Sequence, residues 1–595
     1  MFYLRQLFQR PYLAQLHGHT TLVVLPAICS NKDPLARDKT NQENSTALPR
    51  MVYLVAFRAC ARRENIGIPS AVPSLTMLNN VLSSHNMFII NTPFISEEWH
   101  KLLLNTTSFN KFSNIPNAIH SGFNMGIISP PSFTYTPPNH NSALSYPAHI
   151  LSHIHNELHN HCYTGPFSCS CLEFLIGPFC MSPLGTIPKV GLQTEHRVIQ
   201  DLSFPRNDPS LPSINDGIDP ELFTCNWGTF NDVKTIVLKA PPNTEAATLD
   251  VDSAFRHCPI VPSQQSSFII HWDDMYYIDH NAPFSATSSG GVFGKMADAF
   301  SSILKYKGFG PSKNWVDKFV FFRYPTSPDT LPPSFSYSLD DIYSLALQLG
   351  WPWKDSKTKP SSSLFKYLGF SWNLSSKTVE IPAKKRTYYL MKLSPWSPSQ
   401  NFSRKDTESL LGTLVHCSLA LPDGHSCLSL LSCFAASFNH FTSPFVQGSP
   451  SPTILTDIHW WCAQLLTDFC GSLISKPPAL SPLEFWVDAS SSWGIGIVFD
   501  DTWDAWKLKS GWNKDGCDIV WAKIVSIELS LLFAIHSSHS NTHFCVKSDN
   551  QGIITQLNMA DPGILSKTES YNKLLYFPVN IASGFLHYMY RPSIT

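Results

Sequence analysis

Two aspartates stand at the ends of short, apolar, strand-like runs. Asp250 ends the run Ala247-Thr248-Leu249, and Asp317 follows Trp315-Val316 later in the chain. Carboxylates from neighbouring strands can hold a pair of divalent cations, which activate a hydroxyl nucleophile and stabilise the phosphates that leave. These residue types in this setting predict a two-metal nucleotidyl-transfer site on Asp250 and Asp317, with Mg²⁺ or Mn²⁺ as the metal.

The surrounding elements must bring both carboxylates together. Trp315–Phe322 is typical of a strand, a two-residue turn and a second strand. The alternative pair Asp340-Asp341 is rejected because Leu339–Leu349 has a helical pattern. Further strand-like runs are Ala247–Val251, Phe268–Trp272 and Tyr367–Trp372. Helical runs are Ala148–His161, Gly294–Tyr306 and Arg404–Phe438. This mixture predicts an α+β fold in which helices back an antiparallel sheet.

The order of the motifs resembles the fingers and palm of a reverse transcriptase, and is most similar to DIRS-like retroelement polyproteins. The fragments that carry the likeness are Thr92-Pro93-Phe94, Gly165–Ser168, Gly177-Pro178-Phe179, Ile199–Pro205 and Gly291–Gly294. The resemblance covers roughly residue 87 to the C-terminus. It implies RNA-directed DNA synthesis on a primer–template of RNA and DNA, with deoxynucleoside triphosphates as substrates. Asp250, Val251 and Asp317 would be the metal ligands.

The resemblance also implies roles for residues around the incoming nucleotide. Lys189 and Arg197 would bind its triphosphate, and Lys357 would act as a general acid towards pyrophosphate. Phe255 lies five residues past Asp250, where the family carries an aromatic gate. A bulky ring there would crowd a ribose 2′-hydroxyl and so favour deoxynucleotides.

Two glycine-bearing segments receive positioning roles from the same resemblance. Gly290 and Gly291 would let the backbone approach the template and the nucleotide closely, because they carry no Cβ. Tyr367, Leu368 and Gly369 would form the hairpin that holds the primer end.

Lys318 departs from the family pattern, since it stands where the family has the second aspartate of the hairpin. An ammonium group there would repel a bound cation, by several kcal/mol at ~4 Å for an effective dielectric near ~20. Polymerisation is therefore predicted to be absent or severely reduced. The alternative reading is a catalytically inactive nucleic-acid-binding relic that retains the fold. The intact Asp250 and Phe255 favour a reverse transcriptase, and Lys318 favours the inactive relic.

Three further acids follow a second alternation of strand and helix patterns. Strand-like runs end at Asp488 and Asp549, and the helix-like run Lys523–His536 carries Glu528. The arrangement resembles ribonuclease H, whose carboxylates hold two metals that activate water against an RNA strand. The three acids match three of the four acidic positions of that family, and the chain stops where the last would be expected. The resemblance therefore implies a truncated ribonuclease H-like α/β domain.

Composition predicts a folded protein, and the net charge by itself predicts no strong partner. Apolar residues make up 43% of the sequence, enough for several buried cores, and the formal net charge is −1. Between Lys354 and Lys405, however, the sequence has eleven Lys and Arg residues and only two acidic residues, Asp355 and Glu380. This basic strip could bind a phosphate backbone, or it could be the solvated face of a loop.

The sequence predicts five segments. These are residues 1–86, unassigned; 87–170, a retroelement-specific N-terminal segment; 171–390, fingers and palm; 391–478, thumb and connection helices; and 483–595, the ribonuclease H-like domain. The fold class is thus a right-hand polymerase domain followed by an α/β domain. The oligomeric state is left open.

The cellular setting is predicted from cysteines and apolar runs. Fifteen cysteines lack a repeating spacing and their number is odd, which is typical of reduced intracellular thiols. The apolar run Thr21–Ile28 is too short to span a membrane. An intracellular protein that does not associate with membranes is expected, and nucleus and cytoplasm are equally open.

Overall fold

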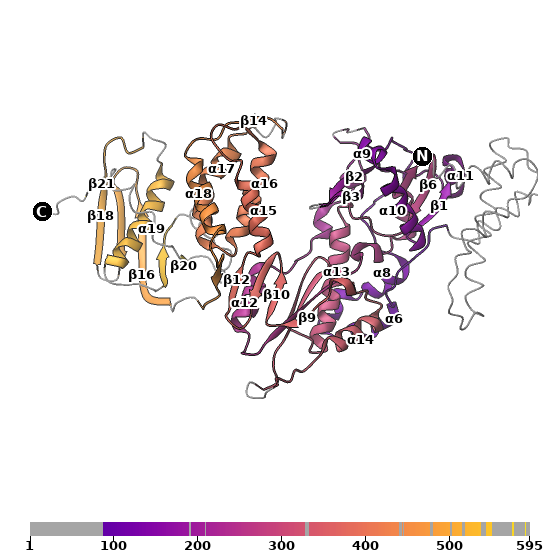
Figure 1. Cartoon of the computed structure of the whole chain (residues 1–595), viewed down its shortest axis with the longest axis horizontal. Coiled ribbons are helices and arrows are strands. Elements are labelled where there is room, and N and C mark those ends of the chain that lie inside the picture. The colour runs from indigo at the N-terminus through magenta and orange to yellow at the C-terminus, as the bar shows by residue number, and fades with distance from the viewer. Residues whose placement is uncertain are drawn as a thin grey trace, which may run out of the picture. The chain divides into compact units, whose positions relative to one another are not determined.

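The computed structural model describes residues 87–549 with short gaps, together with Leu574–Leu575 and Met589–Tyr590 (Figure 1). The gaps are residues 190–191, 207, 209, 328–331, 439–442, 444, 477–479, 500–501, 514–517 and 537–542. The unassigned segment 1–86 lies outside the described residues. Helices and strands are mixed throughout, as the sequence predicts.

The described residues divide into two compact units. The first comprises residues 87–227, Leu249–Phe321 and Ser336–Pro360, and the second comprises Gly228–Thr248, Phe322–Phe335 and the residues after 360. The five predicted segments follow other bounds and stay predictions.

The first unit begins with helices and then alternates short strands with helices. Its helices are α6 (Ser96–Leu103), α7 (Phe109–Phe112), α8 (Ile115–Ser121), α9 (Asn141–Ser145), α10 (Pro147–His159), α11 (Cys169–Ile176), α13 (Ser289–Tyr306) and α14 (Leu339–Leu349). Its short 3-10 turns are η2 (Asn215–Gly217), η3 (Pro220–Phe223), η4 (Ala254–His257), η5 (Pro262–Ser267) and η6 (Asp355–Lys357). Its strands are β1 (Tyr163–Phe167), β2 (Leu184–Lys189), β3 (Leu192–Gln200), β5 (Ile269–Trp272), β6 (Met275–Asp279) and β7 (Ser312–Trp315).

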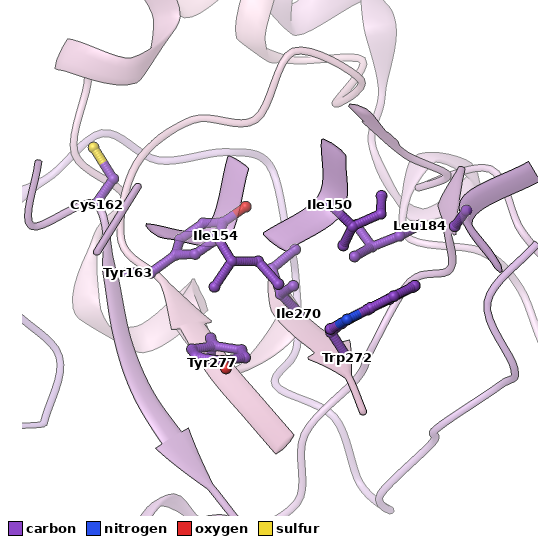
Figure 2. Close-up of a cluster of buried hydrophobic side chains, with 9 residues drawn as sticks. Ile150, Ile154, Cys162, Tyr163, Leu184, Ile270, Trp272 and Tyr277 are labelled. Atoms are coloured by element: carbon purple, nitrogen blue, oxygen red, sulfur yellow. The ribbon is translucent and has the colours of Figure 1, made fainter. Parts of the chain in front are cut away.

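Helix α10 covers a three-stranded sheet in the order β1-β6-β5. Ile150 and Ile154, four residues apart, lie on one face of the helix because of its 3.6-residue period. Figure 2 shows both side chains facing Tyr163 of β1 and Ile270 and Trp272 of β5, and all five are buried. This core holds α10 against the sheet.

The sheet that carries the candidate site has the order β7-β8-β4-β9, with β4 at Glu245–Asp250, β8 at Lys318–Arg323 and β9 at Lys359–Ser362. Strands β7 and β8 form an antiparallel hairpin in which Trp315 pairs with Lys318. Val316 and Asp317 are therefore the two turn residues, as predicted. Val316 has φ +52°, a left-handed conformation that β-branched residues rarely adopt.

Helices α6, α13 and α14 share an aromatic cluster. Trp99 of α6 is fully buried, and its Nε1–H donates to the carbonyl oxygen of Leu349 at 2.9 Å. Phe300 of α13 stacks on Trp351 with ring centroids 4.4 Å apart. At the start of α14, Asp341 accepts hydrogen bonds from Ser338 in a capping box. Asp341 thus caps a helix, and the rejection of this aspartate pair as a catalytic hairpin is consistent with its setting.

The second unit contains a four-stranded sheet and a group of helices. The sheet has the order β10-β11-β12-β15, with β10 at Leu364–Tyr367, β11 at Phe370–Asn373, β12 at Thr378–Glu380 and β15 at Gly471–Leu473. The helices are α12 (Phe230–Lys239), α15 (Ala383–Leu393), α16 (Arg404–Ser418), α17 (Ser429–Ala436) and α18 (Ile454–Leu465), of which α15 to α18 lie side by side (Figure 1). The short strands β13 (Phe402–Ser403) and β14 (Gln447–Gly448) pair with each other.

The single helix predicted over Arg404–Phe438 is wrong, because the chain breaks between α16 and α17. The 3-10 turn η7 occupies Pro422–Leu428. Proline disfavours the helical conformation in the residue before it, and Leu421 accordingly has φ −126° and ψ 77°. The chain therefore turns at Leu421 before it resumes as α17.

The C-terminal part of the second unit is a six-stranded sheet in the order β20-β19-β16-β17-β18-β21. Its strands are β16 (Leu480–Ala489), β17 (Gly494–Phe499), β18 (Thr502–Leu508), β19 (His543–Lys547), β20 (Leu574–Leu575) and β21 (Met589–Tyr590), and its helix is α19 (Ile519–His536). Strands β16, β17 and β18 are antiparallel neighbours, whereas β19 runs parallel to β16. Phe485, Ile497 and Ile527 belong to the core between sheet and helix.

Cysteines and apolar helices bear on two predictions about the whole chain. The described cysteines outside α11 include the buried free thiols Cys162, Cys258 and Cys417, and the intracellular location stays a prediction. Within the described residues, no helix combines the length and the hydrophobicity needed to cross a bilayer.

Candidate functional site

The structure brings Asp250 and Asp317 together, as the sequence predicts. Asp250 is the last residue of β4 and is buried, with 8% of its surface exposed. The backbone N–H of Val251 donates to the carbonyl oxygen of Asp317 at 2.7 Å. Burial raises the pKa of the Asp317 carboxyl, and the negative charge of Asp250 raises it further. The two carboxylates therefore share one electrostatic environment at the end of the sheet.

Two lysines occupy the space around Asp250. Lys357 Nζ lies 3.1 Å from Asp250 Oδ2, and Lys318 Nζ lies 4.0 Å from Asp250 Oδ1. Lys318, although adjacent to Asp317 in sequence, thus points to the other aspartate of the pair. Lys357, predicted to act towards pyrophosphate, is placed as an ion-pair partner of Asp250.

The segment after α14 explains how Lys357 reaches this position. The backbone N–H of Lys354 donates to the carbonyl oxygen of Asp250 at 2.8 Å. The backbone N–H of Asp252 donates to the carbonyl oxygen of Pro352 at 3.0 Å. Lys354 Nζ also donates to Asp252 Oδ1 at 2.7 Å. Sequence reasoning did not find the pairing of Lys354 with Asp252. The only signal for it in the sequence was the basic strip that begins at Lys354.

The side chains around Asp250 do not fit a pair of divalent cations. Asp250 Oδ1 is buried and accepts no hydrogen bond from the described residues, as a metal ligand could. However, the ammonium groups of Lys318 and Lys357 lie against the same carboxylate. Within the described part of the chain, no cluster of three or more His, Cys, Asp or Glu side chains is arranged to hold a metal ion.

Phe255 lies in the short turn η4 directly after the strand that carries Asp250. Its half-buried ring contacts the rings of Phe284 and Phe293, with centroids 5.1 and 5.7 Å away. The sequence predicted a turn through Ser253-Ala254-Phe255, and the structure has a 3-10 turn at Ala254–His257. The ring is thus held in place by other aromatic side chains, as a steric gate would require.

Arg256, the next residue, was missed by sequence reasoning. Its guanidinium contacts both carboxylate oxygens of Asp279, at 2.8 and 3.0 Å, and Glu157 Oε2 at 2.8 Å. The side chain is only 8% exposed. Because Glu157 belongs to α10 and Asp279 to β6, this charge network fixes η4 between them.

His280, which follows Asp279, is buried as a neutral side chain. Its Nδ1 lies 2.6 Å from Gln265 Oε1, and its Nε2 lies 2.7 Å from Thr164 Oγ1. The amide nitrogen of Gln265 donates to two backbone carbonyls, so Oε1 is the acceptor and His280 Nδ1 carries the proton. Burial lowers the pKa of His280 from 6.5 to about 3.

The first unit is therefore expected to lose stability as the pH falls below about 6.5. The unfolded chain binds a proton at His280 that the folded chain excludes, so unfolding becomes easier by up to ~1.4 kcal/mol per pH unit. Urea unfolding between about pH 7.5 and pH 5 measures this dependence. The variant His280→Gln should show a weaker dependence, whereas replacing the exposed His159 by Gln should leave it unchanged. Equal pH dependence in wild type and His280→Gln contradicts this reading.

The two glycines predicted to face the nucleotide have different surroundings at the start of α13. A Cβ added to Gly291 would lie 2.1 Å from the carbonyl oxygen of Phe223, whereas one added to Gly290 would meet no atom within 4 Å. Gly291 therefore allows η3 to approach the helix. Of the two, Gly290 is the residue whose backbone faces open space.

Lys189 and Arg197 lie on the β2–β3 hairpin. Arg197 pairs with Ile187 in the antiparallel register and its side chain is exposed. Lys189 ends β2. Their binding of a triphosphate stays a prediction.

A hairpin joins β10 and β11 where the sequence predicted the turn that holds the primer end, and that role stays a prediction. Leu368 and Gly369 have φ +50° and +85°, which defines the tight turn favoured by antiparallel hairpins. His416 Nε2 lies 3.0 Å from the carbonyl oxygen of Leu368, so α16 fixes the turn. Tyr367 is only 1% exposed, so its ring supports the hairpin from inside and leaves the turn residues as the accessible part.

A second group of acids lies at the end of the C-terminal sheet. Asp488 of β16 and Asp549 after β19 reach the same edge, because the two strands run parallel. Lys523 of α19 lies between them, with Nζ 3.1 Å from Asp488 Oδ1 and 2.5 Å from Asp549 Oδ1. Glu528 is half-buried on the same helix, and burial raises its pKa. Sequence reasoning found the three acids but missed Lys523.

No family model and no curated protein matches the sequence. Similar solved structures include the foamy viral protease–reverse transcriptase in complex with an RNA/DNA hybrid, at 14% identity and a TM-score of 0.43 over 75% of this chain and 56% of that chain. The same viral protein in complex with double-stranded DNA gives 13% identity and a TM-score of 0.42 over 76% of this chain and 89% of that chain. This chain thus spans just over half the length of the first. At these values the likeness carries no functional argument.

Proposed function

We propose that this chain is a reverse transcriptase-like protein that binds a primer–template but performs RNA-directed DNA synthesis at a severely reduced rate or not at all. The observation that carries the proposal is the pairing of Asp250 with Lys357 and Lys318. A polymerase would need this carboxylate for cations, and here its two oxygens face ammonium groups at 3.1 and 4.0 Å.

The class of protein rests on the arrangement of the sheet and its hairpin. A buried aspartate ends β4, and a second aspartate occupies the adjacent β7–β8 turn. The aromatic Phe255 and the fixed β10–β11 turn follow in the order that such polymerases require. The proposal includes the fingers, palm and thumb subdomains and an origin in a DIRS-like retroelement. Mg²⁺ or Mn²⁺ would be the metal of the ancestral reaction.

The C-terminal sheet supports the ribonuclease H-like part of the proposal. Three antiparallel strands are followed by a helix and a strand parallel to the first, which is the connectivity of that fold. Binding of nucleic acid would use the exposed lysines of the basic strip, namely Lys359, Lys366, Lys384 and Lys405. An intracellular location belongs to the same proposal.

Primer extension tests the central claim. The wild-type chain should extend a DNA primer on an RNA template only at background level, in Mg²⁺ or in Mn²⁺. The variant Lys318→Asp should gain activity by at least ~10-fold, because removing one ammonium group lowers the cost of binding a cation by more than ~1.4 kcal/mol. Fluorescence anisotropy on the same samples should show that both proteins bind the primer–template.

A matched variant controls for charge. Lys313→Asp changes the same charge on β7 of the same hairpin and should gain no activity. If the wild-type chain extends the primer as fast as Lys318→Asp, the lysine does not suppress catalysis and the proposal is wrong. If neither protein binds nucleic acid, the proposed class is wrong as well.

A further inference from the structure

Lys523 places one ammonium group between two carboxylates that belong to different strands. Its Nζ lies 3.1 Å from Asp488 Oδ1 and 2.5 Å from Asp549 Oδ1. The lysine side chain is 11% exposed, whereas those of the two aspartates are 69% and 70% exposed. The buried side chain of Lys523 therefore holds the ammonium group in place, and the two carboxylates contact it from the solvent side.

The fold sets this geometry in two ways. In the parallel ladder Trp486 pairs with Lys547, so Asp488 and Asp549, each two residues further on, leave the sheet at the same edge. On α19 the neighbours Ala522 and Val525 are buried in the core under the sheet. The helix is therefore anchored at the turn that carries Lys523, and this fixes the position of the lysine backbone.

We propose that Lys523 is a built-in cation that takes the place of a divalent metal between Asp488 and Asp549. Mg²⁺ bound to these oxygens would need distances of ~2.0–2.1 Å and would have to displace the ammonium group. Without Lys523, two negative charges would face each other across the strand ends. This inference rests on the ribonuclease H-like part of the proposed function, because that resemblance is what places a metal between the two carboxylates.

The consequence is that the strand ends of this sheet do not respond to divalent cations in the native chain. Removing the lysine creates a site that a cation can fill, since both carboxylates remain at the same edge. Mn²⁺ is a suitable probe because it accepts carboxylate oxygens.

Hydrogen–deuterium exchange of the full chain tests the proposal by segment. Peptides that contain residues 480–489 and 543–547 should exchange equally in wild type with and without about 10 mM MnCl₂. In Lys523→Met the same peptides should exchange ~10-fold faster without metal, because local opening becomes easier. Adding MnCl₂ should return them to within ~2-fold of wild type, since the cation restores the bridge.

Two further variants separate this role from an ordinary ion pair. Lys547→Met removes a lysine of β19 that pairs with the single carboxylate of Glu484, and MnCl₂ should not reverse its effect. Lys523→Arg keeps a positive charge and should behave as wild type.

Each remaining outcome decides the proposal. If exchange of the strand ends in wild type slows in MnCl₂, a metal already binds there and the proposal is overturned. A Lys523→Met chain that folds only with MnCl₂ supports it. If Lys523→Met stays destabilised in MnCl₂, the lysine is not a replacement for a metal. Loss of primer–template binding would bear on the proposed function alone.

Discussion

Replacing Arg256 by methionine is expected to destabilise the first unit by about 3–5 kcal/mol. Methionine fills a similar volume, but it leaves the carboxylates of Glu157 and Asp279 without their cation. Asp279 is 1% exposed in its side chain and both its oxygens contact the guanidinium. Breaking a buried ion pair by removing one partner is costly, because the remaining charge is neither paired nor solvated.

The pair of Arg206 with Asp201 is a control for this prediction, because its arginine is exposed and its aspartate, 12% exposed, also contacts His140. Its geometry is also bidentate, with both contacts at 2.8 Å, but the Arg206 side chain is 58% exposed. Arg206→Met should therefore cost at most ~1 kcal/mol. Hydrogen–deuterium exchange of α10 and β6 measures both variants in the full chain. Equal losses in the two variants would show that burial does not set the importance of Arg256.

Replacing Gly291 by alanine is expected to cost at least ~1–3 kcal/mol. The new Cβ would lie 2.1 Å from the carbonyl oxygen of Phe223, and the backbone carbon of Phe223 lies 2.5 Å from it. Backbone atoms cannot move aside as a flexible side chain can, so η3 and α13 must separate. Exchange of the peptides that contain η3 and α13 should increase, and the melting temperature should fall.

The neighbouring Gly290 supplies the control. It lies in the same turn of α13, and an added Cβ meets no atom within 4 Å. Gly290→Ala should leave stability unchanged or raise it by up to ~1 kcal/mol, because alanine favours a helix more than glycine does. If both alanine variants are equally stable, the close approach at Gly291 has no energetic consequence.

Sequence alone predicted the elements whose signal is local. The two-residue turn at Val316 and Asp317 follows from two strand-like runs on either side of it, and α14 begins and ends at the predicted residues Leu339 and Leu349. The meeting of Asp250 and Asp317 could be predicted because both stand at strand ends that the resemblance placed side by side.

What escaped prediction depends on partners far away in the chain. Arg256 contacts Glu157 and Asp279 across 99 and 23 residues of sequence, and no periodicity indicates such a pairing. Lys523 looked like one more polar residue at the start of a helix, because its two aspartates lie on other strands. The break after α16 had a local signal in Pro422, and the apolar pattern on both sides of it concealed that signal.

The burial of Trp99 determines where this protein can be shortened. A fragment that begins at residue 171, where the polymerase-like motifs start, would lack α6 and the indole donor that satisfies the carbonyl of Leu349. The rings of Phe300 and Trp351 would then face water, and such a fragment would tend to aggregate during recombinant expression. Soluble production of the first unit therefore requires a start before Ser96, upstream of every residue to which the resemblance gives a catalytic role.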